Sequence, residues 1–471
     1  MAMQFPLAFA AALAIACAAP ASAAPLRPDQ AAFREMFVEL VNTDTSHSSG
    51  SCTLAAEQLA ARMWAAGFTK QEVRVIIPPG HEREGNLVAE FKGASPSLQP
   101  MLLMAHLDVV EARREDWARN PFTLVEEDGY FYGRGVADDK ARTAIWVDSL
   151  IRYRQEGYRP KRTIKLAATC GEEGNGEVLN GAEWLARNMP ETLSAEFALN
   201  EGGGGRLDPT GNQQALAMQI GEKATRTFEL EVVNPGGHSS VPRPDNAIYD
   251  LAAAIIAIRD LRFPVQLNPT TRAFLRQYAP VLPAAFQQAI ADLLDNETDA
   301  AAGATLARDP AIDAMLRTTC VTTMTEAGHA ANALPQRAKA TINCRILPAM
   351  TTEEVQTALE RAIANPQVRL SLRTPYRPTA IPAPLDSKIM GPATKLAAEH
   401  FPGIPMIPIM LTGATDATMV GLLGIPVYGV PGLFFDADGG GAHGLNERIQ
   451  VRSVYDGRDY LYRLVKLYAE E

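Results

Sequence analysis

Cysteine and histidine are scarce in this chain, whose 471 residues include five cysteines and seven histidines. Four of the cysteines, Cys52, Cys170, Cys320 and Cys344, follow the first 23 residues. Their spacings are too long for a zinc ribbon or a CxxC site, so the common cysteine-based metal motifs are excluded. An oxidising compartment permits disulfides, but the pairing cannot be read from the sequence. We expect at least two of these cysteines to be small buried apolar side chains.

A basic excess and long apolar runs are also missing. Lys and Arg number 44 against 54 Asp and Glu, which gives a formal net charge of -10. This balance argues against nucleic-acid binding, because no surplus of cations is available to neutralise phosphates. Beyond the first 23 residues, no segment reaches the roughly 18 apolar residues of a membrane span. The sequence therefore predicts neither a nucleic-acid partner nor a membrane span.

The N-terminal segment differs from the rest of the chain. Residues 5–19 carry no charge and are followed by the small-x-small sequence ASA at 21–23. This pattern predicts a signal peptide over residues 1–23 and an exported protein, periplasmic or secreted, although no Lys or Arg precedes the apolar run. Two alternatives stay open: a retained apolar helix, and a lipoprotein anchored through Cys17, for which Ala14 is a poor fit.

The remaining chain alternates short apolar runs with helical patterns. Runs such as residues 101–105 lie between helix-like stretches, which is typical of an α/β sheet covered on both faces. From residue 221 the pattern changes to half-buried strands and amphipathic helices, typical of a small α+β domain. We predict an α/β fold in which one domain, at residues 24–220 and 376–471, is interrupted by a smaller domain at 221–375. The smaller domain contains a helix-rich insertion at about 267–319, which the pattern does not place.

The first candidate site residues follow an apolar run directly. His106 and Asp108 lie two residues apart after residues 101–105, and such residues in a strand project to one face. Asp108 can therefore hold one ring nitrogen of His106 and leave the other for a metal. Taken alone, the pair is more commonly a surface histidine near an aspartate.

Four more segments place a carboxylate or a histidine beside glycine. They contain Asp138 (GRGVADDK), Glu172 and Glu173 (CGEEG), Glu201 (NEGG) and His443 (GGAHG). Each segment could be a solvated turn. However, each resembles the others in placing its residue just beyond a buried strand, and open α/β sheets bind ligands at the edge where their strands end. As a set, two nitrogen donors and three oxygen donors suffice for two zinc sites that share one bridging carboxylate. Glu172 is left over and is free to act as a general base.

The order of these motifs resembles that of the glutamate carboxypeptidase and aminoacylase family of two-zinc metallopeptidases. The matching segments are HLDVV, DWARNPF, YGRGVADDK, GEEG, NEGG, GGHSSVP and a C-terminal AHG. They span essentially the whole chain after residue 23. The resemblance implies a catalytic domain with a mixed sheet flanked by helices, interrupted by a smaller α+β lid domain that usually forms a homodimer.

The resemblance also implies roles for single residues. Asp138 would bridge two zinc ions, with His106 and Glu201 at one ion and Glu173 and His443 at the other. Glu172 matches the general base, and Asp108 the carboxylate behind the first histidine.

Further matches concern the substrate. His238 matches a lid histidine that reaches the partner subunit's active site and polarises the scissile carbonyl; from the residues alone, it could be a loop histidine that caps a helix near Asn246. Arg345 would clamp a substrate carboxylate, or it could form a surface salt bridge. Asn332, Gly413 and Thr415 match other substrate-binding positions.

The predicted activity is hydrolysis of an amide bond next to a free carboxylate, with two Zn²⁺ per subunit, although these ligands also accept Co²⁺ or Mn²⁺. A dipeptidase or carboxypeptidase leads, because an exported enzyme meets peptides before cytosolic metabolites. An N-acyl amino acid deacylase is the alternative, and a non-catalytic binding protein on the same fold is a remote one.

Three features depart from the family pattern. Gly171 stands where the family commonly has Asp, and Ala141 replaces a usual Gly. The insertion at 267–319 resembles that of the extended-lid, carboxypeptidase S-like branch, and we expect it to make a long lid that shapes the substrate pocket.

Overall fold

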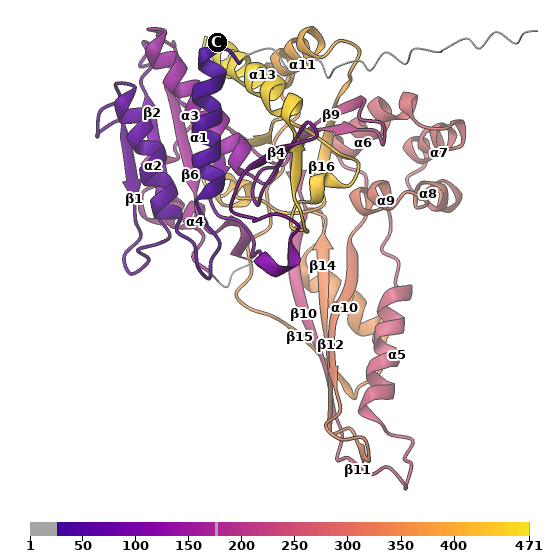
Figure 1. Cartoon of the computed structure of the whole chain (residues 1–471). Helices are drawn as coiled ribbons and strands as arrows, with labels where there is room; N and C mark the ends of the chain where they lie inside the picture. Colours follow the sequence, from indigo (N-terminus) through magenta and orange to yellow (C-terminus); the bar gives the residue numbers. More distant parts are fainter. Residues whose placement is uncertain (1–25, 175–177, 471) are drawn as a thin grey trace, which may run out of the picture.

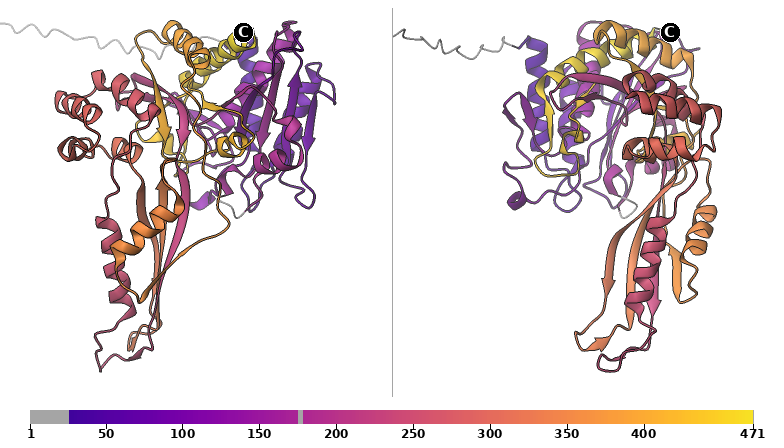
Figure 2. Two further views of the ribbon diagram at one scale, coloured as in Figure 1. Left: turned by 180° about the vertical axis from the view of Figure 1, so that it is seen from behind. Right: turned by 90° about the vertical axis from the view of Figure 1, so that its right-hand side faces the viewer.

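The computed structural model describes residues 26–174 and 178–470. It consists of an α/β body and a long lid that projects from the body (Figures 1 and 2). The predicted signal peptide and Cys17 lie outside the described residues. In the part of the chain that the structure describes, no helix has both the length and the apolar character that crossing a membrane requires.

The body is built on a ten-stranded mixed sheet in the order β1-β2-β6-β3-β7-β17-β9-β8-β18, with β16 paired to β9. Strands β6, β3, β7 and β17 run parallel to one another at its centre. Its strands come from both ends of the chain: β1 (Val73–Ile76), β2 (Asn86–Phe91), β3 (Met101–His106), β6 (Ile164–Thr169), β7 (Phe197–Asn200), β8 (Gly204–Leu207), β9 (Gln213–Glu222), β16 (Met406–Leu411), β17 (Val427–Gly429) and β18 (Phe434–Phe435).

Helices cover both faces of this sheet. Alternate residues of β3 point to opposite faces, so Leu103 belongs to one apolar core and Leu102 to another. The larger core is closed by α1 (Pro28–Asn42), α2 (Cys52–Ala65), α3 (Lys140–Gln155), α11 (Ser387–His400) and α13 (Val451–Ala469). The smaller core is closed by α4 (Gly181–Asn188) and α12 (Ala417–Gly421). Double coverage explains why the central strands appear in the sequence as continuous apolar runs.

A small separate sheet and several short helices complete the body. The sheet has the order β19-β5-β4 and consists of β4 (Val125–Glu127), β5 (Tyr130–Tyr132) and β19 (Arg448–Gln450). The short 3₁₀ helices of the chain are η1 (Arg114–Asp116), η2 (Glu172–Gly174), η3 (Pro190–Thr192), η4 (Ala279–Val281) and η5 (Gly439–Gly441).

The lid is an antiparallel sheet in the order β12-β14-β10-β15 with two helices on one face. Its elements are β10 (Ala224–Val233), α5 (Ala247–Asp260), β12 (Thr319–Ala327), β14 (Arg337–Ile346), α10 (Thr352–Ile363) and β15 (Val368–Leu372). Buried and half-buried residues alternate along β10 and β14, as expected for a sheet packed on one side. The short pair β11 (Gly237–His238) and β13 (Ala333–Leu334) forms the far end of the lid (Figure 1).

The helix-rich insertion does not lengthen the lid, contrary to the expectation from the sequence. It forms α6 (Pro269–Tyr278), α7 (Ala284–Asp295), α8 (Ala300–Leu306) and α9 (Pro310–Leu316). Its apolar faces share a core with Ala215 of β9 and Ile407 of β16, so the insertion packs on the body sheet. The physical reason is that these strand residues offer an uncovered apolar surface, which the amphipathic insertion helices bury.

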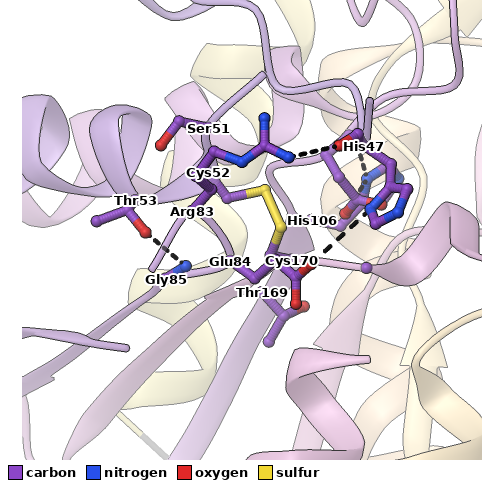
Figure 3. Close-up of a disulfide and its surroundings, with 12 residues drawn as sticks. His47, Ser51, Cys52, Thr53, Arg83, Glu84, Gly85, His106, Thr169 and Cys170 are labelled. Atoms are coloured by element: carbon purple, nitrogen blue, oxygen red, sulfur yellow. Dashed lines mark hydrogen bonds and ion pairs between the residues drawn. A yellow bond between two sulfur atoms is a disulfide. The ribbon is translucent and has the colours of Figure 1, made fainter. Parts of the chain in front are cut away.

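The expectation that at least two cysteines are unpaired apolar side chains is wrong. Cys52 is bonded to Cys170, and Cys320 is bonded to Cys344. The first disulfide joins the start of α2 to the residue that follows β6 (Figure 3). The second links directly opposed positions of β12 and β14 in the lid. Neither contact is visible in the sequence, because 118 and 24 positions separate the partners.

Candidate metal centre and active site

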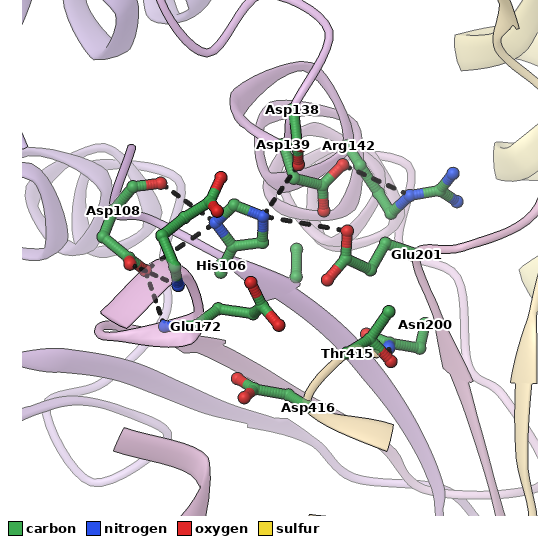
Figure 4. A network of polar contacts seen from close by, with 12 residues as sticks. His106, Asp108, Asp138, Asp139, Arg142, Glu172, Asn200, Glu201, Thr415 and Asp416 are labelled. Carbon is green, nitrogen blue, oxygen red and sulfur yellow. Dashed lines mark hydrogen bonds and ion pairs between the residues drawn. The ribbon is translucent and has the colours of Figure 1, made fainter. Parts of the chain in front are cut away.

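The candidate site lies at the carboxyl edge of three neighbouring parallel strands. β3 ends at His106, β6 ends just before Glu172 and Glu173, and β7 ends just before Glu201. Each side chain therefore emerges at the same edge of the sheet, where open α/β sheets bind ligands. Figure 4 shows His106 between Asp138, Glu201 and Glu172.

Two sets of donor atoms meet at Asp138. His106 Nε2 lies 3.0 Å from Asp138 Oδ1 and 3.7 Å from Glu201 Oε2. His443 Nε2 lies 3.1 Å from Asp138 Oδ2 and 2.9 Å from Glu173 Oε1. In each set of three residues the donor atoms are within 4.8 Å of one another. The structure thus brings together all five residues that the sequence suggested as metal ligands, and each oxygen of Asp138 faces a different set.

The orientation of His106 is set by a main-chain group rather than by the carboxylate we expected. His106 Nδ1 lies 2.9 Å from the carbonyl oxygen of Asp108, to which it must donate. Nε2 is therefore the ring nitrogen that faces Asp138, and in the neutral ring it is free to bind a metal ion. The Asp108 carboxylate is 3.7 Å from Nδ1 and accepts hydrogen bonds from the main-chain nitrogens of Glu172 (3.2 Å) and Glu173 (3.0 Å). Asp108 therefore holds the loop that carries both glutamates.

A buried glutamate that sequence reasoning missed holds the loop of Asp138. The Glu447 carboxylate, which is fully buried, accepts hydrogen bonds from Arg134 Nη1 (2.9 Å) and from the main-chain nitrogens of Gly135 (3.0 Å), Ala137 (2.8 Å) and Asp138 (3.1 Å). Arg134 also donates to the carbonyl of Gly444, beside His443. The only signal in the sequence was a glutamate four positions after His443.

A second buried glutamate orders the loop that contains Gly413 and Thr415. Glu222 accepts hydrogen bonds from the main-chain nitrogen and the hydroxyl of Thr415, both at 2.9 Å. Asn200 donates to the same hydroxyl at 3.1 Å. Asp416 accepts from Thr169 at the end of β6 (2.7 Å). These contacts place residues 413–416 beside the carboxyl ends of β6 and β7.

Two arginines, one in a lid strand and one in the segment that follows the lid, differ in their partners. Arg345 of β14 donates to Asn343 Oδ1 (3.1 Å) and to Thr225 Oγ1 (2.8 Å). Among the described residues, no carboxylate lies within ion-pair distance of Arg345, so its charge has only neutral acceptors. Arg377, which sequence reasoning missed, donates from Nη1 to Glu172 Oε1 at 3.0 Å. Nothing in the local sequence around Arg377 signals this contact.

The structure does not bring His238 and Asn332 to the site of their own chain. Both are exposed at the far end of the lid, where the main-chain nitrogen of Ser239 donates to the carbonyl of Asn332 at 3.1 Å. His238 Nδ1 accepts from the main-chain nitrogen of Ser240 at 3.1 Å. In Figure 1 this end of the lid points away from the body.

The electrostatics of the cluster favour a cation. Burial lowers the pKa of His106, but the charges of Glu201 and Asp138 outweigh burial and raise the pKa well above its usual value. Burial raises the pKa of Glu172 to about 8, against the opposing effects of Arg377 and His106. Hydrogen bonds to Asp138 and Glu173 raise the pKa of His443 to about 10. The pKa values of these three residues are raised because several carboxylates share one buried space. The same negative potential attracts a divalent cation.

The donor set fits two divalent metal ions. Each set offers one imidazole nitrogen and two carboxylates, which is the ligand type and number of a catalytic zinc site that keeps a position open for water. His106, Asp138 and Glu201 would hold one ion, and Asp138, Glu173 and His443 the other. Glu172 lies beside both sets without being needed as a ligand.

The chain is similar to several known proteins. A model of peptidase family M20/M25/M40 matches residues 102–467. The human N-fatty-acyl-amino acid synthase/hydrolase PM20D1 is 29% identical over 386 residues, covering 80% of this chain and 75% of the human protein. The probable carboxypeptidase S-like 2 of Dictyostelium discoideum is 30% identical over 391 residues, covering 81% of this chain and 74% of that protein. An M20 family metallo-carboxypeptidase from Sulfolobus solfataricus shares the fold, with a TM-score of 0.69, 19% identity, and coverage of 94% of this chain and 100% of that one.

Proposed function

The chain belongs to peptidase family M20/M25/M40 and is a hydrolase of that family, and on this basis we propose that it is an exported two-zinc enzyme that cuts the amide bond next to a free carboxylate. The observation that carries the proposal is the pair of donor sets that share Asp138, with Glu172 beside them. A shared carboxylate between two histidine-containing sets is the arrangement a two-metal hydrolase needs.

Glu172 is the proton-transfer group of the proposed reaction. When bound, the two metal ions would lower the pKa of a coordinated water toward about 7 and polarise the scissile carbonyl. The Glu172 carboxylate takes the proton of the attacking water and later gives it to the leaving amine nitrogen. Its side chain is only 10% exposed, so bulk water does not compete for the proton.

Arg345 is the proposed recognition group for the substrate. It is half-buried, its charge has no carboxylate partner in the described chain, and its neighbours in β14 and β10 hold it through neutral acceptors. A planar guanidinium in this state matches a carboxylate in two parallel hydrogen bonds. Binding there would place the amide bond next to the carboxylate over the metal ligands.

A homodimer would complete the site. His238 and Asn332 lie together at the exposed end of the lid, and the resemblance to the family assigns the histidine to the partner's site. We propose that two chains associate through their lids, so that each His238 donates to the scissile carbonyl oxygen in the other subunit. A donor at that position stabilises the developing oxyanion, typically by about 3–4 kcal/mol.

Two substrate classes fit this chemistry. A dipeptide or a longer peptide presents its C-terminal carboxylate next to the amide bond, as expected for a carboxypeptidase or a dipeptidase. An N-acyl amino acid presents the same atoms, and the similarity to human N-fatty-acyl-amino acid synthase/hydrolase PM20D1 favours this second class. The peptide class leads because we propose export, on the basis of the leader-like residues 1–23.

The test is amino acid release by zinc-loaded protein from matched dipeptides, longer peptides and N-acyl amino acids, each with a C-terminally amidated control. Release from free-carboxylate substrates alone, lost with a chelator, supports the proposal and identifies the class. Equal release from amidated substrates would contradict the role of the carboxylate. No release from any substrate, with two metals bound per chain, would contradict the proposed activity.

A further inference from the structure

The segment that returns from the lid to the body carries an unassigned active-site group. Residues 373–386 connect β15 to α11 and contain no helix or strand. The segment contacts both parts of the molecule, through Arg226 of the lid strand β10 and through Glu172 of the body. Arg377 lies in this segment, and its side chain is only 15% exposed.

Arg377 contacts Glu172 at two points. Nη1 donates to Oε1 of the carboxylate at 3.0 Å, and Nη2 donates to the main-chain carbonyl of the same residue. The two contacts bind both ends of the Glu172 residue to one planar group, which limits rotation of its side chain. Among the described residues, only one oxygen of the Glu172 carboxylate accepts a hydrogen bond. Figure 4 shows the carboxylate directed toward the space beside His106.

The lid anchors Arg377 in its turn. Arg226 of β10 donates from Nη1 to the carbonyl of Arg377 at 2.8 Å and from Nη2 to Thr379 Oγ1 at 3.1 Å. Its Nε donates to Thr352 Oγ1 of α10 at 2.9 Å, and its guanidinium stacks on the Tyr376 ring at 4.1 Å. Because these contacts reach the main chain and the neighbours of Arg377, we expect them to persist when the Arg377 side chain is changed.

We propose that Arg377 is a positioning residue for Glu172: it fixes one oxygen and the main chain of the general base, so that the other oxygen faces the attacking water. The inference rests on the proposed function and deepens it. Glu172 is a side chain with several rotatable bonds, and a proton-transfer group must lie within hydrogen-bond reach of its proton. Arg377 supplies that constraint, and its positive charge offsets repulsion between Glu172 and neighbouring Glu173.

Burial lowers the pKa of Arg345, and the positive charge of Arg377 lowers it further, so the two guanidinium groups influence each other. Their partners nevertheless differ. Arg377 is already paired with a carboxylate of the protein, whereas Arg345 has only neutral acceptors in the part of the chain that the structure describes. Arg377 therefore acts on the general base, and Arg345 is left to bind the substrate. Kinetics can separate these roles, because loss of positioning lowers kcat and loss of substrate binding raises KM.

The experiment compares Arg377→Met, Arg377→Lys and the matched control Arg373→Met in the full-length, zinc-loaded protein. Arg373 lies four residues away in the same segment and pairs with Glu229 at 2.8 Å on the exposed lid surface. We expect Arg377→Met to lower kcat by about 10- to 100-fold with KM unchanged, because a misplaced group costs up to about 100-fold. Arg377→Lys should keep part of the kcat that Arg377→Met loses. Guanidinium ion, added to Arg377→Met at sub-denaturing concentration, should restore part of kcat. Arg373→Met should match the wild type, with two metals per chain in every variant.

Several results would overturn the proposal. A raised KM with unchanged kcat would place Arg377 on the substrate, and no change in either constant would remove it from the site. A fall in kcat that neither lysine nor guanidinium reverses would indicate a purely structural role.

A crystal structure of the metal-loaded wild type tests the contact independently of activity. Glu172 within hydrogen-bond distance of Arg377 supports the inference, and a Glu172 carboxylate bonded elsewhere overturns it. If the loaded protein hydrolyses no substrate, the proposed function fails, while this structure still decides the contact.

Discussion

The main-chain nitrogen of Asp138 donates a 3.1 Å hydrogen bond to Oε1 of Glu447, and 309 positions separate the two residues. Asp138 is the residue that both donor sets share, and Glu447 follows His443 by four positions. The buried carboxylate of Glu447 thus fixes the loop of Asp138, and Glu447 itself lies in the same loop as the ligand His443. The two halves of the body meet at this contact.

Replacing Glu447 with Gln should weaken metal binding. An amide retains one acceptor oxygen and presents donors to the main-chain N–H groups at the other position, so the loop of Asp138 loses its support. Loss of such a supporting group typically costs about 10- to 100-fold in metal affinity. Competition with a chelator measures the effect, and Glu399→Gln, on an exposed surface pair with Arg463, is the control. Unchanged affinity would contradict the role of Glu447.

Replacing Arg345 with Ala should raise KM and leave kcat nearly unchanged for free-carboxylate substrates. A hydrogen bond to a charged group contributes about 1.5–3 kcal/mol, which corresponds to a KM increase of about 10- to 100-fold. The matched measurement uses the amidated substrate, on which wild type and variant should be equally poor. An equal KM for Arg345→Ala and wild type on the free acid would refute the carboxylate clamp.

His238 should act in the partner subunit. We expect His238→Ala and Glu172→Gln homodimers each to be nearly inactive, because one lacks the oxyanion donor and the other the base. Mixing the two after partial unfolding and refolding should restore activity, since one site of each mixed dimer keeps both groups. Size-exclusion chromatography with light scattering checks the dimer. If the mixture stays inactive although mixed dimers form, His238 does not act in trans.

The two disulfides should contribute unequally to stability. The Cys52–Cys170 loop spans 118 positions and the Cys320–Cys344 loop 24. Constraint of the unfolded chain predicts losses of about 5 and about 3.5 kcal/mol, respectively, when each pair is replaced by serine. Urea unfolding of the two double variants measures the difference. A larger loss for the lid pair would contradict this explanation.

The strand edges were predictable because apolar runs in the sequence are followed within a few residues by a histidine or a carboxylate, as at His106, Glu172 and Glu201. The buried run at 101–105 lies in β3. The family that the motifs resemble and the expected α/β fold are both confirmed. Three of the five suggested ligands, His106, Glu173 and Glu201, lie at or just after strand ends, whereas Asp138 and His443 come from loops. The assignment of zinc and of each role remains our proposal.

Other features depend on contacts between distant parts of the chain. Glu447 and Arg377 act through hydrogen bonds to residues far away in the sequence: Asp138 lies 309 positions from Glu447, and Glu172 lies 205 positions from Arg377. No local pattern encodes those contacts. The packing of the insertion on β9 and β16 depends on an apolar surface that exists only after the body sheet forms. The disulfides were missed because spacing carries no information on pairing over such distances.

The central claim is that Glu172 moves the proton at a site with two metal ions. The most direct measurement is turnover of the best free-carboxylate substrate by zinc-loaded Glu172→Gln, with metal content determined on the same sample. We predict two metals per chain and a fall in kcat of about 100- to 10,000-fold, because the amide cannot accept the proton. A Glu172→Gln protein that binds both metals and turns over at the wild-type rate would contradict the account.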